Sequence, residues 1–238
     1  MQRYFVNKIN NAIVFNDSDI HHILHVMRMK KGEQIEVVLD GTLYCATIDN
    51  TNPLDVSLTY SIPSDSEIER DVTLFYALAK GDKIDLVVQK ATELGVKRIV
   101  LLATERCVVK WDEKETGKKI ERFKKIVKEA SEQSHRLLIP EILGVYSLNN
   151  LPKELLSDLN FFAYEKEAGH TQSFLSALKD SSGSVSILVG PEGGFSIKES
   201  EYVTKELGFV PVSLGKRILR SETAAIYALS VIGFILEK

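Results

Sequence analysis

The chain has 238 residues, of which 44% are hydrophobic and 26% are charged, and its formal net charge at pH 7 is −3. That composition is typical of a folded globular protein and excludes a disordered or fibrous chain. The slight acidity excludes a globally basic nucleic-acid-binding domain, so any contact with nucleic acid must come from local patches.

The sequence shows no sign of a membrane span or a metal site. No stretch approaches the ~18 consecutive apolar residues of a spanning helix, and the first ten residues lack a basic patch followed by an apolar run. We therefore expect a cytoplasmic protein. Cys45 and Cys107 stand alone in apolar surroundings, which favours buried free thiols over metal ligands.

Residues 3–60 mostly predict short β segments. Alternating apolar residues over 35–39 lead into Asp40-Gly41, and the pattern resumes over 43–48, which predicts a hairpin. Residues 17–29 have apolar residues at helical spacing after Asp17 and Ser18, which are candidate caps. The pattern predicts a small β-barrel or curled sheet with one helix.

The segment 62–71 is polar, contains a proline and shows neither the apolar periodicity of a helix nor that of a strand, so it is the predicted linker. We place a domain boundary near residue 68, which divides the chain into a β-rich domain, 1–68, and a second domain, 69–238.

The second domain has continuous apolar runs that alternate with helical patterns. Runs of this kind indicate strands covered on both faces, as in a mainly parallel α/β sheet. The predicted strands cover 72–78, 98–102, 159–163, 185–189 and 210–214. The predicted helices cover 84–94, 118–137, 171–178, 197–207 and 222–236.

The sharpest local feature is ILVGPEGGFS at 187–196, where a buried-strand pattern runs directly into a glycine-rich turn and a helix start. Strand ends of this kind hold ligands in open α/β sheets, and the glycines let backbone approach a bound group. Ser196 and Glu199 have capping-box spacing, so we interpret Ser196 as a cap and not as a nucleophile. A tight turn without a ligand is the alternative, and the loop matches neither the P-loop nor the Rossmann template.

A second feature is LGKRILRSETAA at 214–225, where a short strand enters a basic loop and then a long apolar helix. Ser221 is the predicted N-cap, and Glu222 lies in the first turn, where the helix dipole favours a carboxylate. The loop contains three cations, Lys216, Arg217 and Arg220. They are interpreted either as solvent-exposed surface residues or as a group that binds an anion. Their position beside a second glycine-containing strand end favours binding.

These two motifs are similar to those of the SPOUT-class methyltransferases. More narrowly, the chain resembles the ribosomal RNA small-subunit methyltransferase E family, which makes 3-methyluridine in 16S ribosomal RNA. The resemblance extends to HVMRMKKG at 25–32, AKGD at 79–82, QKATELGV at 89–96 and EASEQSHR at 129–136, so it covers nearly the whole chain.

The resemblance implies a PUA-like N-terminal RNA-binding domain and an α/β domain whose C-terminal segment forms a deep trefoil knot. It also implies that the knot loops bind S-adenosyl-L-methionine in a bent conformation and that two subunits pair to complete the site. Carried onto this chain, the cofactor-binding residues are Tyr164, Glu165, Leu188, Val189, Gly190, Gly193, Gly194, Leu214, Gly215, Ile218, Leu219 and Ser221.

Methyl transfer requires the substrate nitrogen to lie in line behind the sulfonium methyl group, so we expect positioning and electrostatics to supply most of the catalysis. We assign Arg220 to the developing negative charge of uracil or to phosphate, because it is the cation nearest the predicted helix start. Glu192 is the candidate for shaping the site or accepting a proton. A hydrogen-bonded loop carboxylate is an equally good interpretation of Glu192.

Contacts with RNA are expected, from the resemblance, at Arg3, Arg28, Lys30 and Arg136. The segment 114–128 holds seven lysines and arginines against two acids. A solvated helix face is the commoner explanation of such a segment, and phosphate contacts are the alternative. His21, His22 and His25 are interpreted as surface or RNA-facing residues, because no carboxylate or cysteine completes a metal set.

The expected partners are 16S ribosomal RNA or the small ribosomal subunit and a second copy of the chain. Two other functions stay open. A non-catalytic, dimeric RNA-binding module is disfavoured by the intact glycine loops, and saturable binding of S-adenosylmethionine would exclude it. An α/β enzyme of small nucleotides would be excluded by activity on ribosomal RNA without activity on free nucleosides.

Overall fold

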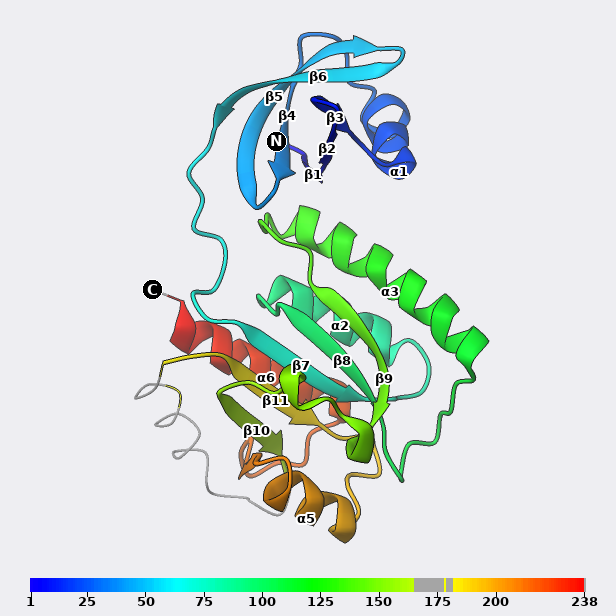
Figure 1. Ribbon diagram of the computed structural model, residues 1–238, viewed down its shortest axis with the longest axis vertical. Helices are drawn as coiled ribbons and strands as arrows, with labels where there is room; N and C mark the ends of the chain where they lie inside the picture. The colour runs from blue at the N-terminus through cyan, green and yellow to red at the C-terminus, as the bar shows by residue number, and fades with distance from the viewer. Residues whose placement is uncertain (165–177, 179–181, 238) are drawn as a thin grey trace. The chain divides into compact units, whose positions relative to one another are not determined.

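The computed structural model describes residues 1–164, 178 and 182–237. They form two compact units, one of Met1–Glu67 with Ser131–Leu138, the other of Ile68–Ala130 with Ile139–Lys238. The first unit is rich in strands and the second is an α/β unit (Figure 1).

The first unit contains a four-stranded sheet in the order β1-β4-β5-β6 and a small hairpin, β2-β3. Its strands are β1 (Arg3–Phe5), β2 (Asn7–Ile9), β3 (Ala12–Val14), β4 (Gln34–Leu39), β5 (Thr42–Thr51) and β6 (Leu54–Ser61). The helix α1 (Asp17–His21) continues into a π-helical turn, His22–Val26. Apolar side chains of β4 and β5, among them Ile35, Val37 and Ile48, are fully buried in the core of this unit.

The predicted hairpin is confirmed, because β4 pairs antiparallel with β5 and Leu39 lies opposite Thr42. Asp40 and Gly41 have φ angles of 48° and 74°, and positive values at both positions define a type I′ turn. The predicted helix is shorter than expected, because the chain turns into a left-handed conformation at Arg28, with φ of 55°.

The N-cap of α1 is Asn16, whose side chain accepts a hydrogen bond of 2.9 Å from the Asp19 backbone N–H. The candidate caps Asp17 and Ser18 were therefore wrong by one or two positions. Asp17 lies in the first helical turn, where its negative charge interacts favourably with the helix dipole.

The second unit is built on a six-stranded sheet in the order β12-β10-β11-β7-β8-β9, in which every neighbouring pair is parallel. The strands are β7 (Val72–Ala77), β8 (Arg98–Ala103), β9 (Glu141–Ser147), β10 (Leu159–Ala163), β11 (Val185–Val189) and β12 (Val210–Val212). The helices are α2 (Lys83–Glu93), α3 (Glu113–Gln133), α5 (Ile197–Lys205) and α6 (Ser221–Leu236), with 3-10 turns at Leu148–Asn150 and Lys153–Leu155.

Helices cover both faces of this sheet, which explains the unbroken apolar runs of its central strands. Alternate residues of β7 and β11 pack on one face with α2, α3 and α6. The intervening residues pack on the other face with α5 and with the segment 148–156. All six residues of β7 and all five of β11 are buried.

The predicted fold class, a mainly parallel α/β unit preceded by a β-rich one, is confirmed, and each of the five predicted strands is present. The trefoil knot implied by the resemblance stays a prediction. The edge strand β9 was not predicted, because it is only partly buried and Gly144 interrupts its pattern.

The helix α3 begins five residues before its predicted start and ends at Gln133, because His135 adopts a left-handed φ of 59°. The predicted helix at 171–178 lies outside the described residues except for Leu178. Within the described residues, no helix is long and apolar enough to cross a membrane.

Gly95 ends α2 with a φ of 87°, and a Cβ built on it would lie 2.2 Å from Ile68 Cδ1. We predict that Gly95→Ala lowers the free energy of unfolding by at least about 1–2 kcal/mol, because an L residue is strained in this conformation. As a matched control, Gly117→Ala raises it by about 0.5–1 kcal/mol, because Gly117 lies within α3 and nothing stands within 4 Å of an added Cβ. Urea denaturation measures both, and an unchanged midpoint for Gly95→Ala would contradict the assignment.

Candidate functional site

A cavity of about 410 Å³ lies at the carboxyl ends of β10, β11 and β12. Three segments line it: Ala163 and Tyr164 at the end of β10, 189–195 at the end of β11, and 213–221 between β12 and the start of α6, with Ala224 of α6. Its volume is within the range of about 300–1,000 Å³ usual for small-molecule sites. The sheet therefore brings together the two connections that the sequence singled out.

The loop 190–194 is held in one conformation by short contacts. A Cβ on Gly190 would lie 2.6 Å from the ring of Phe195, so only glycine fits beneath that ring. The Gly194 N–H donates to the Pro191 carbonyl at 2.9 Å, and the Arg106 guanidinium donates to the Gly193 carbonyl at 2.9 Å. The loop is thus fixed both internally and by the connection that follows β8.

The predicted capping box at the start of α5 is confirmed. Ser196 Oγ accepts from the Glu199 N–H at 3.2 Å, and Glu199 Oε2 accepts from the Ser196 N–H at 2.9 Å. The other carboxylate oxygen of Glu199 accepts from the Glu105 N–H at 2.8 Å. Ser196 is therefore a cap, and Glu199 ties the helix start to the connection after β8.

Ser221 is the first residue of α6, and the N-cap is Arg220, so the predicted cap was wrong by one residue. The Ser221 hydroxyl instead shares a buried hydrogen bond of 2.7 Å with the Tyr76 hydroxyl. Burial raises the pKa of Tyr76 to about 12, although the Ser221 hydrogen bond opposes the shift. Tyr76 therefore stays protonated near neutral pH and anchors the helix start to β7.

Lys83, the first residue of α2, joins the two cavity loops. Its Nζ lies 2.7 Å from Glu192 Oε1 and 3.5 Å from Glu222 Oε2. Glu192 lies in the loop after β11 and Glu222 in the first turn of α6, so one ammonium group connects both. Apart from a lysine at a helix start, no local pattern marks this contact, because its partners lie far away in the chain.

The ion pair fixes the charge of both partners. Burial raises the pKa of Glu192, but hydrogen bonds from the Lys83 ammonium and from backbone N–H groups, together with the charge of Lys83, outweigh burial and lower it below its usual value. The hydrogen bond to Glu192 raises the pKa of Lys83. A carboxylate with a lowered pKa is a weak proton acceptor near neutral pH.

Most of the residues expected to bind the cofactor line the cavity, as do Arg220 and Glu192. Those that do so are Tyr164, Val189, Gly190, Gly193, Gly194, Leu214, Gly215, Ile218, Leu219 and Ser221. Leu188 does not line it, because its side chain packs on the opposite face of β11 with Phe75 and Phe162. Glu165 lies outside the described residues. Ile218 is 91% exposed, so its side chain is open to solvent.

Two of the four residues expected to contact RNA are buried in ion pairs of the first unit. The Arg3 guanidinium donates to Glu36 at 2.9 Å and to the His135 carbonyl, and Arg136 lies 2.7 Å from Glu67 Oε2. Arg3 is 6% exposed and Arg136 is 2% exposed, which gives both a structural role within this unit.

The other two, Arg28 and Lys30, are exposed on the surface of the first unit. His22 Nδ1 lies 2.9 Å from the Tyr4 hydroxyl, and the rings of His21 and His25 are 5.1 Å apart. In the parts of the chain that the structure describes, no group of three His, Cys, Asp or Glu side chains is arranged to hold a metal ion.

Comparison with known proteins identifies the class. A family model described as an RNA methyltransferase domain matches residues 66–233, and one described as an RNA methyltransferase PUA domain matches residues 15–58. The α/β unit with its glycine-lined cavity therefore lies within an RNA methyltransferase domain.

Individual relatives narrow this class. The ribosomal RNA small subunit methyltransferase E of Bacillus subtilis is 36% identical over 98% of this chain and 96% of its own length. The protein named ribosomal RNA small subunit methyltransferase E 2 of Borreliella burgdorferi is 34% identical over 95% of this chain and 93% of its own. The chain belongs to the ribosomal RNA small subunit methyltransferase E family.

A solved structure agrees with this assignment. The ribosomal RNA small subunit methyltransferase E of Neisseria gonorrhoeae, bound to S-adenosyl methionine, superimposes with a TM-score of 0.83 at 28% identity. The similarity covers 99% of this chain and 98% of that one.

We predict that Lys83→Met raises the pKa of Glu192, because removing the ammonium group leaves burial to act on the carboxylate without a charged donor. Carboxyl-carbon NMR of the side chain, followed as a function of pH, measures this pKa. Lys90→Met is the matched control, because Lys90 lies on the same helix but pairs with Glu93 at 2.8 Å. An unchanged Glu192 pKa in Lys83→Met would show that the contact is not made in solution.

Proposed function

We propose that this chain transfers a methyl group from S-adenosyl-L-methionine to N3 of a uridine in 16S ribosomal RNA of the small subunit. The observation that carries the proposal is the cavity between 190–194 and 214–221, in a chain of this family. We assign RNA binding to a domain of residues 1–68 and methyl transfer to residues 69–238. Because its substrate is ribosomal RNA, we place the protein in the cytoplasm.

The cavity fits an adenosyl cofactor. Its lining is mostly backbone and small or apolar side chains, with glycines at 190, 193, 194 and 215. Gly215 has a φ of 114°, which turns the chain sharply at the cavity wall. Backbone N–H and carbonyl groups are the kind of partner that suits the hydrogen-bonding edges of adenine and ribose, and Tyr164 adds an aromatic side chain to the lining.

When bound, S-adenosylmethionine supplies a methyl group on a positively charged sulfur, which makes that carbon an electrophile. Uracil N3 would lose its proton to water, and its lone pair would bond to this carbon as the carbon–sulfur bond breaks and the sulfur departs as a neutral thioether. The protein has to hold the uracil in line and to stabilise the negative charge that the departing proton leaves on the ring.

Arg220 is positioned to stabilise the negative charge on the uracil ring. It is the N-cap residue of α6, lines the cavity and is exposed, so its guanidinium can reach a substrate. The N-terminus of α6 adds the partial positive charge of a helix dipole at the same place. We assign Arg220 to the developing charge on uracil.

Glu192 is assigned to shaping the site. Its carboxylate is engaged by Lys83, and its lowered pKa makes it a poor proton acceptor. Holding Glu192 and Glu222 on one ammonium group keeps the two loops of the cavity at a fixed separation. This favours a role of Glu192 in shaping the site over a role as the proton acceptor.

We also propose that the chain acts as a homodimer through α6. Tyr227 and Phe234 are 44% and 83% exposed, and a spacing of seven residues places them on one face of the helix. Exposed large apolar side chains along a helix are typical of an interface. The expected occupant of this face is α6 of a second copy.

For the dimer, we predict that Phe234→Glu converts the protein to a monomer, because it buries an unpaired charge in the interface. Sedimentation equilibrium measures the mass. Val108→Glu, at a residue that is 66% exposed outside α6, is the control that should leave the mass unchanged. A wild-type chain that sediments as a monomer would contradict the dimer.

For the active site, we predict that Arg220→Ala lowers kcat on 16S ribosomal RNA by about 100-fold or more, with little change in cofactor affinity. Arg220→Lys should restore part of the rate, because the charge is retained. Single-turnover methylation and isothermal titration with S-adenosylmethionine measure the two quantities. Normal turnover by Arg220→Ala would remove Arg220 from the mechanism.

A strain that lacks this protein tests the assignment of 16S ribosomal RNA as the substrate. Ribosomal RNA from a strain that lacks this protein should lose one methylated uridine in its 16S fraction by mass spectrometry, and the wild-type gene should restore it. In vitro, the protein should methylate ribosomal RNA or small subunits and leave free uridine unmodified. An unaltered 16S methylation pattern, or activity on free nucleosides, would contradict the proposal.

A further inference from the structure

We propose that three lysines of α3, Lys114, Lys118 and Lys125, bind the phosphate backbone of the RNA substrate beside the methyl-transfer cavity. We refer to these residues as the α3 lysine row. The proposal rests on the function proposed above and extends it, because it identifies a surface of the α/β unit that contacts RNA.

The charge of the chain is distributed unevenly. Residues 114–128 contain seven lysines and arginines and two glutamates, which gives this segment a net charge of +5. Because the whole chain has a net charge of −3, the remaining residues together carry −8. A basic segment in an otherwise acidic chain concentrates positive potential at one place on the surface. This concentration of positive charge favours the approach of an anionic partner to α3.

Several cations of this segment are already engaged. Arg122 pairs with Asp85 at 2.9 Å, Lys124 pairs with Glu121 at 2.8 Å, and Lys119 lies 5.7 Å from the centre of the Trp111 ring. In contrast, the three lysines of the row are exposed, and no carboxylate of the described residues forms an ion pair with them. Their ammonium groups are available for a ligand.

The row is straight. Its members are separated by four and by seven residues, so they lie on one face of the helix within about 40° of arc, over a length of about 16 Å. The opposite face is buried, because Phe123 and Val127 pack in the core of the unit. A line of ammonium groups on a rigid helix matches the repeated charges of a nucleic-acid backbone.

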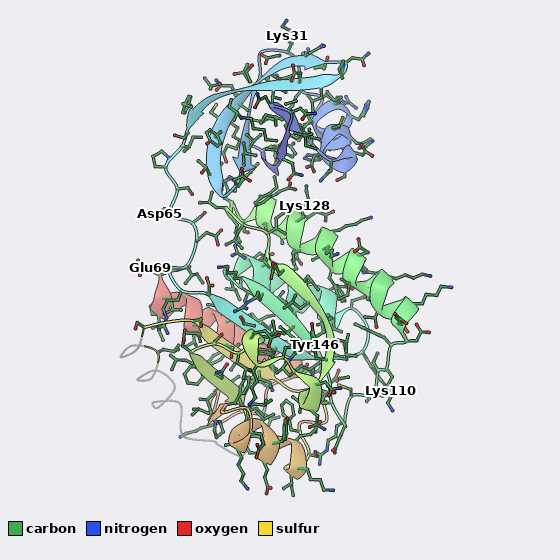
Figure 2. The ribbon with its side chains drawn as sticks, viewed as in Figure 1. Lys31, Asp65, Glu69, Lys110, Lys128 and Tyr146 are labelled. Atoms are coloured by element: carbon green, nitrogen blue, oxygen red, sulfur yellow. The ribbon has the colours of Figure 1, made fainter. Side chains whose placement is uncertain are left out.

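The row begins at the edge of the sheet that carries the cavity. The connection from β8 to α3 leaves the carboxyl end of β8, which runs parallel to β10, β11 and β12. That connection touches the cavity loop directly, through the Arg106 hydrogen bond to Gly193. Figure 2 labels Lys110 in this connection and shows side chains that extend from α3 away from the sheet.

The chemistry of the row indicates backbone contacts and not base recognition. Ammonium groups on flexible stems act as point charges toward phosphate, and contacts of this kind position a nucleic acid without reading its sequence. The α3 lysine row would thus hold RNA that flanks the target uridine, while the cavity selects the base.

The test compares two variants with the same change in charge. The first replaces the row, Lys114→Gln, Lys118→Gln and Lys125→Gln together. The second replaces three exposed lysines that lie outside α3, Lys153→Gln, Lys198→Gln and Lys205→Gln together. Fluorescence anisotropy measures the affinity for 16S ribosomal RNA fragments as a function of salt, and isothermal titration with S-adenosylmethionine reports on the integrity of the cavity.

We expect the plot of log affinity against log salt concentration to become less steep by about two in the row variant, because each lost phosphate contact contributes roughly 0.7–0.9. The control variant should keep the wild-type slope, and both should bind S-adenosylmethionine normally. A wild-type slope in the row variant, or an equal loss in the control, would overturn the proposal.

These outcomes are separate from a failure of the proposed function. If the wild-type protein neither binds nor methylates ribosomal RNA, the function is wrong. If it does both and the row variant behaves identically, only the α3 lysine row is wrong. Single substitutions at the three positions provide a second measurement, in which each should reduce the slope by somewhat less than one.

Discussion

The two β-to-α connections meet because β10 lies between β11 and β12 in a sheet whose strands all run in the same direction. Parallel strands place their carboxyl ends at one edge, where open α/β sheets bind their ligands. Residues 190–194 and 213–221 therefore line one cavity although they are separated in sequence. Every assignment of cofactor and substrate to this protein depends on that juxtaposition.

The cavity is built from backbone and is stiffened from outside. Lys83 connects its two loops through Glu192 and Glu222, Tyr76 anchors Ser221, and the connection after β8 anchors the glycine loop. These contacts come from α2, β7 and the connection after β8, and they add to the hydrogen bond within the glycine loop itself. A site that positions a methyl acceptor benefits from such support, since small displacements cost much of the rate.

Local chemistry explains which parts were predictable from the sequence. The turn at Asp40-Gly41, the capping box at Ser196 and the buried runs of the central strands are specified by neighbouring residues, and each was predicted correctly. The edge strand β9 lacks a clear pattern, and residues 131–138, which lie with the first unit, carry no local signal for that position. The contact of Lys83 with two carboxylates is tertiary, so neither residue spacing nor composition reveals it.

The central claim is that one cavity at the carboxyl edge of the sheet holds an adenosyl group. A crystal structure of this protein grown with S-adenosylhomocysteine tests it most directly. We predict that the adenosyl group lies between 190–194 and 214–221, in the cavity that Arg220 also lines. A ligand bound elsewhere on the protein, or these two segments found apart, would contradict it.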